Sequence, residues 1–142
     1  MSVKIIECPR DAMQGIRKWI PSNDKLSYIQ SVLSVGFDVV DFGSFVSPRS
    51  KSDTDYIIDN LDLSNTKSKL LAIVANQRGA LEASKYSSIS YLGYPFSISE
   101  TFQMRNTNKT MLESLNELKE IKSLCEKFNK ELVVYLSMGF GN

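Results

Sequence analysis

An arginine, an aspartate and a glutamine stand together directly after the apolar run VKII at residues 3–6. In the stretch ECPRDAMQ, Arg10 and Asp11 are adjacent, and Gln14 follows three residues later. Charged groups rarely gather where a buried strand ends unless they pair with one another or act on a ligand. An arginine offers a permanent cation with several donors, and an aspartate offers oxygen ligands to a hard metal ion. The cluster therefore predicts either a structural ion pair or part of a binding site.

Five apolar segments are typical of strands, and their composition favours a parallel sheet. The second and fifth contain adjacent valines, and the third is continuously apolar, as expected for strands that are covered on both faces. We expect these strands over residues 3–8, 37–42, 70–76, 88–94 and 131–137.

Helical patterns fill the intervals between the expected strands. The clearest spans residues 110–129, where Thr110 and Glu113 have the spacing of a capping box and a stripe of Leu112, Leu115, Leu118, Ile121 and Cys125 faces the core. Another spans 22–36, with Ser22 or Asn23 as N-cap and Gly36 as its stop. Two weaker helices are expected over 52–61 and 78–86, and the stretch 42–52 reads as a loop. The order is β-α-β-α-β-α-β-α-β, with right-handed crossovers in one parallel sheet.

Each expected strand leads to polar residues, and in parallel α/β folds ligands bind at the carboxyl ends of the strands. Separate parts of the sequence would therefore converge on one site. Each residue also has a structural interpretation: Asp41 could cap the next loop, and Asn76 taken alone reads better as a turn residue. The residues expected at this edge are Arg10, Asp11, Gln14, Asp41, Ser44, Asn76, Ser99, Glu100, Arg105, Asn106, Ser137 and Asn142.

Composition restricts the classes of function. The 142 residues are 42% apolar and 23% charged with a net charge of +1, which indicates one folded domain and gives no electrostatic basis for nucleic-acid binding. No apolar run has the length of a membrane span, and the N-terminus lacks the pattern of a signal peptide, so we expect a cytoplasmic protein with no membrane partner. Two distant cysteines suggest reduced thiols. The absence of histidine excludes a histidine-based triad, and a metal site within the chain would need oxygen ligands.

The chain stops just after the fifth strand, at YLSMGFGN. A complete (β/α)₈ barrel needs about 250 residues. Two alternatives therefore remain at this point: a complete five-stranded open sheet, or the first part of a barrel.

Four motifs in combination resemble the hydroxymethylglutaryl-CoA (HMG-CoA) lyase family. They are VKIIECPRDAMQ, GFDVVDFGSFVSP, ANQRGALEA and YLSMGFGN, in this order along essentially the whole chain. The first motif would also suit isopropylmalate and citramalate synthases, whereas SFVSP and the third motif favour the lyase. The resemblance implies an incomplete TIM barrel: an α/β, parallel (β/α) repeat with about the first five strands and four helices, spanning 1–142 as the N-terminal part of the lyase domain with no further domain.

The resemblance also implies an activity and residue roles. The family cleaves HMG-CoA to acetoacetate and acetyl-CoA with a divalent metal, Mg²⁺ or Mn²⁺, and its members are expected to be homodimers. By position in the motifs, Asp11 would bind the metal and Arg10 would stabilise the enolate, with Gln14 supporting them. Asp41 stands where the family has a catalytic glutamate. Ser44, Asn76 and Asn106 would bind the acyl-CoA substrate.

Departures from the family pattern limit these expectations. The two histidine ligands and the reactive cysteine of the family lie on later segments, so the remaining metal ligands are expected outside this chain, and the 142 residues alone are expected to be an inactive fragment. RSKSDTD replaces the stretch that follows FVSP in the family, Asp41 is one methylene shorter than glutamate, and Val133 replaces an arginine. An acetyl-CoA-dependent Claisen-type synthase and a non-catalytic α/β module are the alternatives.

Overall fold

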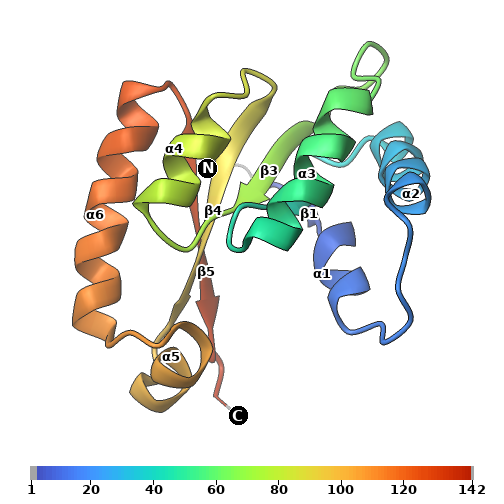
Figure 1. Cartoon of the computed structure of the whole chain (residues 1–142). Coiled ribbons are helices and arrows are strands. Elements are labelled where there is room, and N and C mark those ends of the chain that lie inside the picture. The colour runs from blue at the N-terminus through green and yellow to red at the C-terminus, as the bar shows by residue number, and fades with distance from the viewer. Residues whose placement is uncertain (1–2, 142) are drawn as a thin grey trace.

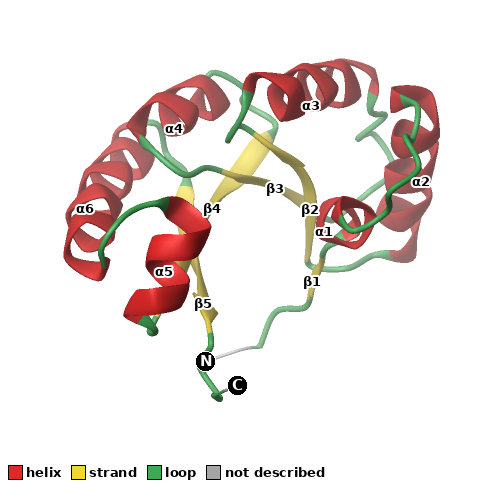
Figure 2. Ribbon diagram, turned by 60° about the horizontal axis from the view of Figure 1, so that its bottom comes forward, coloured by secondary structure: helices red, strands yellow, loops and turns green. Residues whose placement is uncertain are grey.

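The computed structural model describes residues 3–141, in which five parallel strands form one sheet in chain order. The strands are β1 (Ile6–Glu7), β2 (Val39–Ser44), β3 (Lys69–Ile73), β4 (Ile89–Ser97) and β5 (Glu131–Ser137). Neighbouring strands in sequence are neighbours in the sheet, which is the order of a β/α barrel. Figure 2 shows the sheet curling into part of a barrel with the helices outside it. The prediction of a parallel β/α repeat forming an incomplete TIM barrel is confirmed.

Helices connect successive strands, and most of them lie on the convex side of the sheet (Figure 1 and Figure 2). They are α1 (Pro9–Gln14), α2 (Ser22–Val35), α3 (Pro48–Asn60), α4 (Gln77–Ser84), α5 (Glu100–Thr107) and α6 (Met111–Lys127). The predicted number of four helices was too small, because α1 and α5 were not predicted. The loop expected over 42–52 is also wrong, since it contains the end of β2 and the first turn of α3. Within residues 3–141, none of the helices combines the length and the apolar character needed to cross a membrane.

Local signals place the ends of the two longest helices. Gly36 ends α2 with φ = 91°, a left-handed conformation that glycine adopts without steric penalty. The capping box of Thr110 and Glu113 is present at the start of α6, as predicted. The predicted side-chain cap of α2 is wrong: Pro21 precedes the helix, and the Ser22 hydroxyl donates to Asp53 Oδ1 at 2.6 Å.

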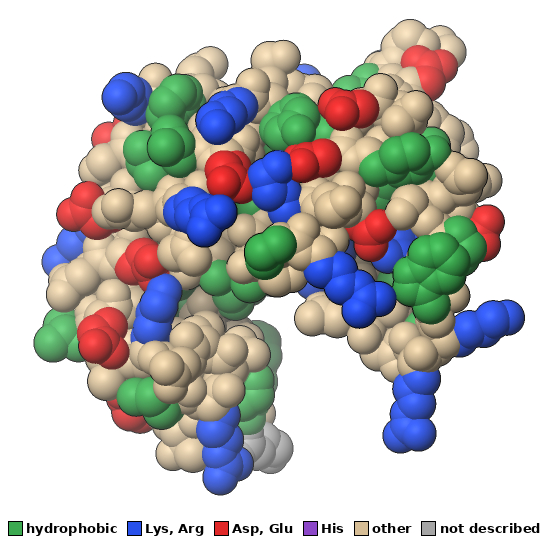
Figure 3. Space-filling model, in the orientation of Figure 1, with side chains coloured by type: hydrophobic (Ala, Val, Ile, Leu, Met, Phe, Trp, Pro, Cys, Tyr) green, Lys and Arg blue, Asp and Glu red, His purple; other side chains and the backbone are tan. Residues whose placement is uncertain are grey.

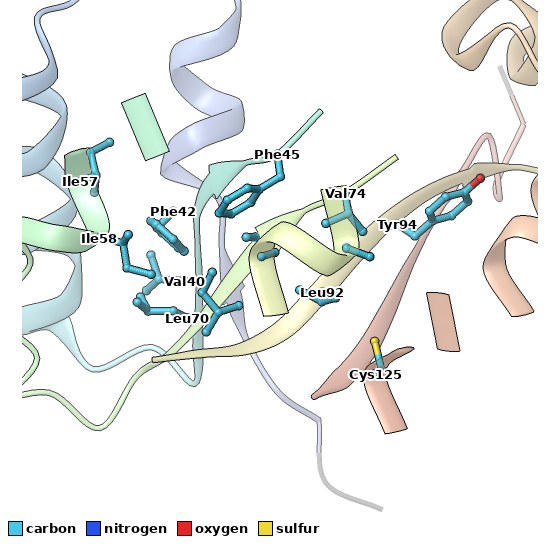
Figure 4. Close-up of a cluster of buried hydrophobic side chains, with 14 of the residues drawn as sticks. Val40, Phe42, Phe45, Ile57, Ile58, Leu70, Val74, Leu92, Tyr94 and Cys125 are labelled. Atoms are coloured by element: carbon cyan, nitrogen blue, oxygen red, sulfur yellow. The ribbon is translucent and has the colours of Figure 1, made fainter. Parts of the chain in front are cut away.

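Apolar side chains cover the sheet on both faces. The larger cluster lies between the sheet and the helices, and Figure 4 shows Val40, Phe42, Leu70 and Leu92 of the strands within it. The smaller cluster lies on the concave inner face and consists of Val39, Leu71, Ile73 and Tyr91, with Ile6, Val133 and Tyr135 packed against it. Burial on both faces explains why the strand sequences are continuously apolar.

The predicted core stripe of α6 is correct only toward the C-terminal end of that helix. Ile121 and Cys125 are buried, and Leu118 packs against the core. Leu112 and Leu115 are 69% and 42% exposed, which contradicts the prediction for the first turns. The reason is the position of the buried face: in the first turns of α6, Met111 and Ser114 face the interior, and Leu112 and Leu115 lie beside them on the exposed side.

Candidate active site at the carboxyl ends of the strands

A cleft of about 920 Å³ opens at the carboxyl ends of the strands, and we call it the C-terminal cleft. Figure 3 shows the molecule hollowed between α1 and α5, the two helices that flank this end of the sheet in Figure 1. The cleft is lined from the end of every strand, which confirms that separate parts of the sequence converge. All seven residues predicted for catalysis, substrate or metal binding line it: Arg10, Asp11, Gln14, Asp41, Ser44, Asn76 and Asn106.

The centre of the cleft wall is an ion pair between Arg10 and Asp41. Arg10 lies on α1 and donates from Nε to both carboxylate oxygens of Asp41, at 3.0 and 3.2 Å, and from Nη2 to Oδ2 at 2.7 Å. The Asp41 side chain is completely buried, whereas the Arg10 side chain is 21% exposed. Such a bidentate pair fixes the plane of the guanidinium group. The arginine therefore faces the cleft in one defined orientation.

Burial and pairing act against each other on the ionisation of these two groups. Burial raises the pKa of Asp41, while the hydrogen bonds and positive charge of Arg10 oppose that rise. Burial lowers the pKa of Arg10, but the hydrogen bonds and negative charge of Asp41 outweigh it, so the pKa lies above its ordinary value. The positive charge of Arg10 and the negative charge of Asp41 therefore stabilise each other, which offsets the loss of contact with water.

Helix α1 adds Gln14 and Asp11 to the pair. The Nη1 atom of Arg10 donates to Gln14 Oε1 at 2.8 Å, a contact that one turn of helix allows at a spacing of four residues. Asp11 points elsewhere: its nearest oxygen lies 3.6 Å from Nη1 and its side chain is 68% exposed. A structural ion pair of Arg10 with the adjacent Asp11, one interpretation of the sequence, is thus only a long contact; the close pair is Arg10–Asp41, and Asp11 keeps most of its carboxylate accessible.

An irregularity in β2 places Ser44 at the cleft. The register with β3 shifts between Asp41 and Gly43, so the alternation of inward and outward side chains changes phase there. A Cβ atom at Gly43 would lie 2.6 Å from Thr54 Cγ2, which shows how closely α3 approaches the strand. Thr54 Oγ1 accepts from the Ser44 amide at 2.8 Å. The glycine therefore lets α3 hold the end of β2 in place.

Asn76 and Asn106 reach the cleft in different ways. Asn76 caps α4 by accepting from the Gly79 amide at 2.9 Å, so its structural role is that of a helix cap and not of an ordinary turn residue, and its binding role stays a prediction. Asn106 is exposed on α5. Buried Gln103 anchors that helix: it accepts from the Ser97 amide at 2.7 Å and donates to Ser114 Oγ at 2.7 Å.

Several residues expected at this edge do not line the cleft. Ser99 caps α5, accepting from the Phe102 amide at 3.4 Å, and Glu100 accepts from the Met111 amide. Arg105 does not contribute to the cleft wall either, whereas Ser137 does. Asn142 lies outside the described residues.

Among the polar residues of the cleft that the sequence interpretation missed are Cys8, Lys25, Lys109 and Tyr135. Both lysines pair with carboxylates, Lys25 with Asp53 and Lys109 with Glu117. Cys8 lies within the motif ECPRDAMQ but was given no role, and no sequence motif marks the other three. Only the alternation of Val133, Tyr135 and Ser137 along β5 could have placed Tyr135 on the inner face.

The carboxylates of the cleft do not by themselves form a metal centre. Across residues 3–141, no group of three or more histidine, cysteine, aspartate or glutamate side chains is placed to hold an ion. Asp41 and Asp53 are engaged by Arg10 and Lys25. Asp11 is the exposed carboxylate of the cleft, and a single carboxylate falls short of the six or more oxygen ligands that hard divalent cations take.

Comparison with known proteins identifies relatives along nearly the whole chain. No protein-family model matches it. Its sequence is 32% identical over 136 residues to the HMG-CoA lyase YngG of Bacillus subtilis, covering 94% of this chain and 45% of that protein. Its curated homologues are HMG-CoA lyases. The mitochondrial HMG-CoA lyase of Arabidopsis thaliana is 30% identical over 142 residues, covering 98% of this chain and 30% of that protein.

Solved structures agree with the sequence comparison. The HMG-CoA lyase of Bacillus subtilis superposes with a TM-score of 0.87 at 30% identity, covering 98% of this chain and 48% of that one. An HMG-CoA lyase from Acinetobacter baumannii, solved with coenzyme A and 3-methylmalate, gives 0.85 at 24% identity, covering 98% and 46%, and supports the fold. The chain matches the N-terminal part of the lyase barrel and spans less than half of the length of the curated relatives it matches.

Proposed function

We propose that this chain provides one side of the active site of a divalent-metal-dependent lyase that cleaves HMG-CoA to acetoacetate and acetyl-CoA. The observation that carries the proposal is the C-terminal cleft: all seven residues expected from the lyase resemblance line it, although they come from the ends of three different strands and from α5. The homology to HMG-CoA lyases gives this geometry its chemical interpretation.

The reaction that this cleft would serve is a retro-aldol cleavage. The hydroxyl on C3 of the substrate gives up its proton, a carbonyl forms at C3, and the C2–C3 bond breaks. The electron pair of that bond becomes the enolate of acetyl-CoA, which then takes up a proton. The enzyme must therefore accept a proton at one oxygen and stabilise negative charge at the thioester oxygen.

Arg10 is suited to the second task. Three of its five N–H groups are used by Asp41 and Gln14: Nε–H, one on Nη2 and one on Nη1. One N–H on each terminal nitrogen is left for a ligand in the cleft. We propose that these donate to the thioester oxygen as the enolate develops. Asp41, predicted as a catalytic residue, is held by the same arginine, and its contribution in our proposal is to orient Arg10.

The metal would involve Asp11. HMG-CoA lyases depend on a divalent metal, which polarises the hydroxyl and carbonyl oxygens of the substrate when bound. The described residues do not hold such an ion by themselves, and Asp11 is the cleft carboxylate free to contribute one ligand. We propose Mg²⁺ or Mn²⁺ as the ion, with its other ligands outside this chain.

The remaining residues of the cleft would bind the substrate. Ser44 and Asn106 lie on opposite sides of the cleft, on β2 and α5, and can contact the acyl group and the coenzyme A portion respectively. An acyl-CoA is thus the proposed partner, and a cytoplasmic location and a homodimer of the whole protein are proposed with it.

The test is cleavage of HMG-CoA by the protein expressed from its own gene, in the presence of Mg²⁺ or Mn²⁺. Acetyl-CoA and acetoacetate should form in equal amounts. Arg10→Gln should lower kcat by about 10²-fold or more, because a preorganised donor to a developing oxyanion is lost. Asp11→Asn should weaken Mn²⁺ affinity in calorimetry.

The matched control is Arg17→Gln, which removes an exposed arginine from the loop after α1. It should leave turnover unchanged. If Arg10→Gln and Arg17→Gln behaved alike, the cleft would not be the lyase site. If free coenzyme A and hydroxymethylglutarate formed and no acetyl-CoA, the reaction would be thioester hydrolysis.

A further inference from the structure

Tyr135 on β5 has a hydrogen-bonding group that no protein side chain satisfies. Its phenol oxygen is buried, and within residues 3–141 it is the one buried side-chain nitrogen or oxygen without a hydrogen-bond partner. Buried polar groups in native proteins are nearly always paired, so an exception needs an explanation. The position of this exception, in the wall of the C-terminal cleft, provides one.

The surrounding residues hold the Tyr135 ring in place across the inner face of the sheet. A Cβ atom at Gly93 of β4 would lie 2.9 Å from Cε2 of the Tyr135 ring and equally close to Leu71 Cδ2. Only the absence of a side chain at Gly93 leaves room for the ring there. The ring thus extends from the edge strand over β4, toward the side of the cleft where Asp41 and Cys8 lie.

Charge and burial keep the Tyr135 hydroxyl protonated. Its pKa is raised by burial and further by the negative charge of Asp41. The other nearby polar group is the thiol of Cys8, a weak hydrogen-bond partner whose own sulfur lies 3.9 Å from the Ile6 carbonyl oxygen. A protonated phenol is therefore a donor, and the thiol beside it is held by no strong bond and can move aside.

The second tyrosine of the inner face shows what a structural role looks like. Tyr91 lies on the neighbouring strand β4, four residues before the residue that pairs with Tyr135, and belongs to the same apolar cluster. Its hydroxyl accepts from Lys4 Nζ at 2.7 Å. Tyr86 and Tyr94 also have partners, the carboxylates of Asp55 and Glu117. Tyr135 differs from all three because it lines the cleft and its hydroxyl has no hydrogen-bond partner.

We propose that Tyr135 orients the acyl group of the substrate by donating its O–H to an acyl oxygen, either the thioester carbonyl or the free carboxylate. This rests on the proposed function. Arg10 approaches the cleft from β1 and α1, and Tyr135 from β5, so the two donors would hold an acyl group from opposite sides. Coenzyme A without an acyl group offers no oxygen at this point, and its binding would not involve Tyr135.

The test compares Tyr135→Phe with Tyr91→Phe, two substitutions that each remove one oxygen from the inner face. Affinities for HMG-CoA and for coenzyme A are measured by calorimetry, and unfolding by thermal melting. Tyr135→Phe should weaken HMG-CoA binding about tenfold, as expected for one hydrogen bond. It should leave coenzyme A binding unchanged and should not lower the melting temperature, because the hydroxyl has no strong partner in the protein. Tyr91→Phe should lower the melting temperature and leave both affinities unchanged.

Each result decides a separate question. A protein that binds neither ligand would overturn the proposed function and this assignment together. Normal binding by the wild type with an unaltered HMG-CoA affinity in Tyr135→Phe would overturn only the assignment. Equal weakening of both ligands, or a lower melting temperature, would show a structural role for the hydroxyl and would overturn it too.

Discussion

The two ends of the inner face of the sheet differ in how completely their polar groups are paired. At the end nearer the strand starts, the polar contact is Lys4 to Tyr91, and Val39 and Leu71 complete a closed apolar layer. At the other end, Arg10 keeps two unused N–H groups, Asp11 stays exposed and Tyr135 lacks a partner. One end stabilises the fold, and the other leaves polar groups available for a ligand. In β/α barrels the two ends likewise serve stability and catalysis respectively.

The largest effect should follow the loss of Arg10. Arg10→Gln leaves the buried Asp41 carboxylate uncompensated, and at pH 7 the free energy of unfolding should fall by about 3 kcal/mol. The pKa of Asp41, which burial already raises, would then lie well above its unfolded value. A group with a raised folded pKa is stabilising below its unfolded pKa and loses that contribution as the pH rises through the folded value. Urea unfolding should therefore show the variant recovering as the pH falls from 7 to 5.

Two further variants sharpen this result. Asp11→Asn alters a mostly exposed carboxylate and should change stability by no more than about 0.5 kcal/mol. Arg10→Gln combined with Asp41→Asn removes both charges and should recover most of the loss. An equal deficit at both pH values would show that Asp41 is not the group left uncompensated.

A smaller loss of stability is expected from a substitution at Gly93, which lies on β4 between the two ends of the inner face. Gly93→Ala would place a Cβ atom 2.6 Å from Ile73 Cδ1 and 2.9 Å from the Tyr135 ring, so overpacking should cost about 1–3 kcal/mol in chemical denaturation. Gly15→Ala is the matched control, because a Cβ atom there meets nothing within 4 Å and φ is −82°. If both variants were equally stable, the ring of Tyr135 would not be held over Gly93.

The smallest effect concerns the two thiols, which lie on opposite sides of the sheet. Burial raises the pKa of Cys125 to about 11, and Cys125 packs in the outer core. Burial also raises the pKa of Cys8, but Cys8 lines the cleft and is only half-buried. Iodoacetamide at pH 8 should therefore label Cys8 slowly and Cys125 only after unfolding, as read by mass spectrometry. HMG-CoA should protect Cys8, and faster labelling of Cys125 would contradict this assignment of the two faces.

The sequence predicts the sheet better than the small helices beside the cleft. Strands β2 and β3 follow from apolar runs because burial on both faces leaves a continuous signal, and β5 has such a run although its residues are only half-buried or exposed. Helix α5 has no apolar stripe and depends on the buried amide of Gln103, a contact that periodicity does not reveal. Helix α1 is only six residues long, too short for a periodic pattern, although Pro9 at its start is a known helix signal.

The residues of the site divide in a similar way. Arg10, Asp11 and Asp41 could be predicted because the ends of parallel strands meet at one edge. The orientation of α1 decides which carboxylate pairs with Arg10, and that orientation cannot be predicted from the sequence. The importance of Tyr135 depends on Gly93 of the neighbouring strand and on an absent partner, and both are visible only in three dimensions.

The central claim is that the unpaired end of the inner face binds an acyl-CoA. The most direct measurement is a titration of the ¹⁵N-labelled 142-residue chain with HMG-CoA, followed by amide chemical shifts. We predict that the shifts concentrate at Arg10, Gln14, Ser44, Asn106 and Tyr135, around the C-terminal cleft. Shifts confined to the outer surface between α3 and α4, or no shifts at millimolar ligand, would contradict the account.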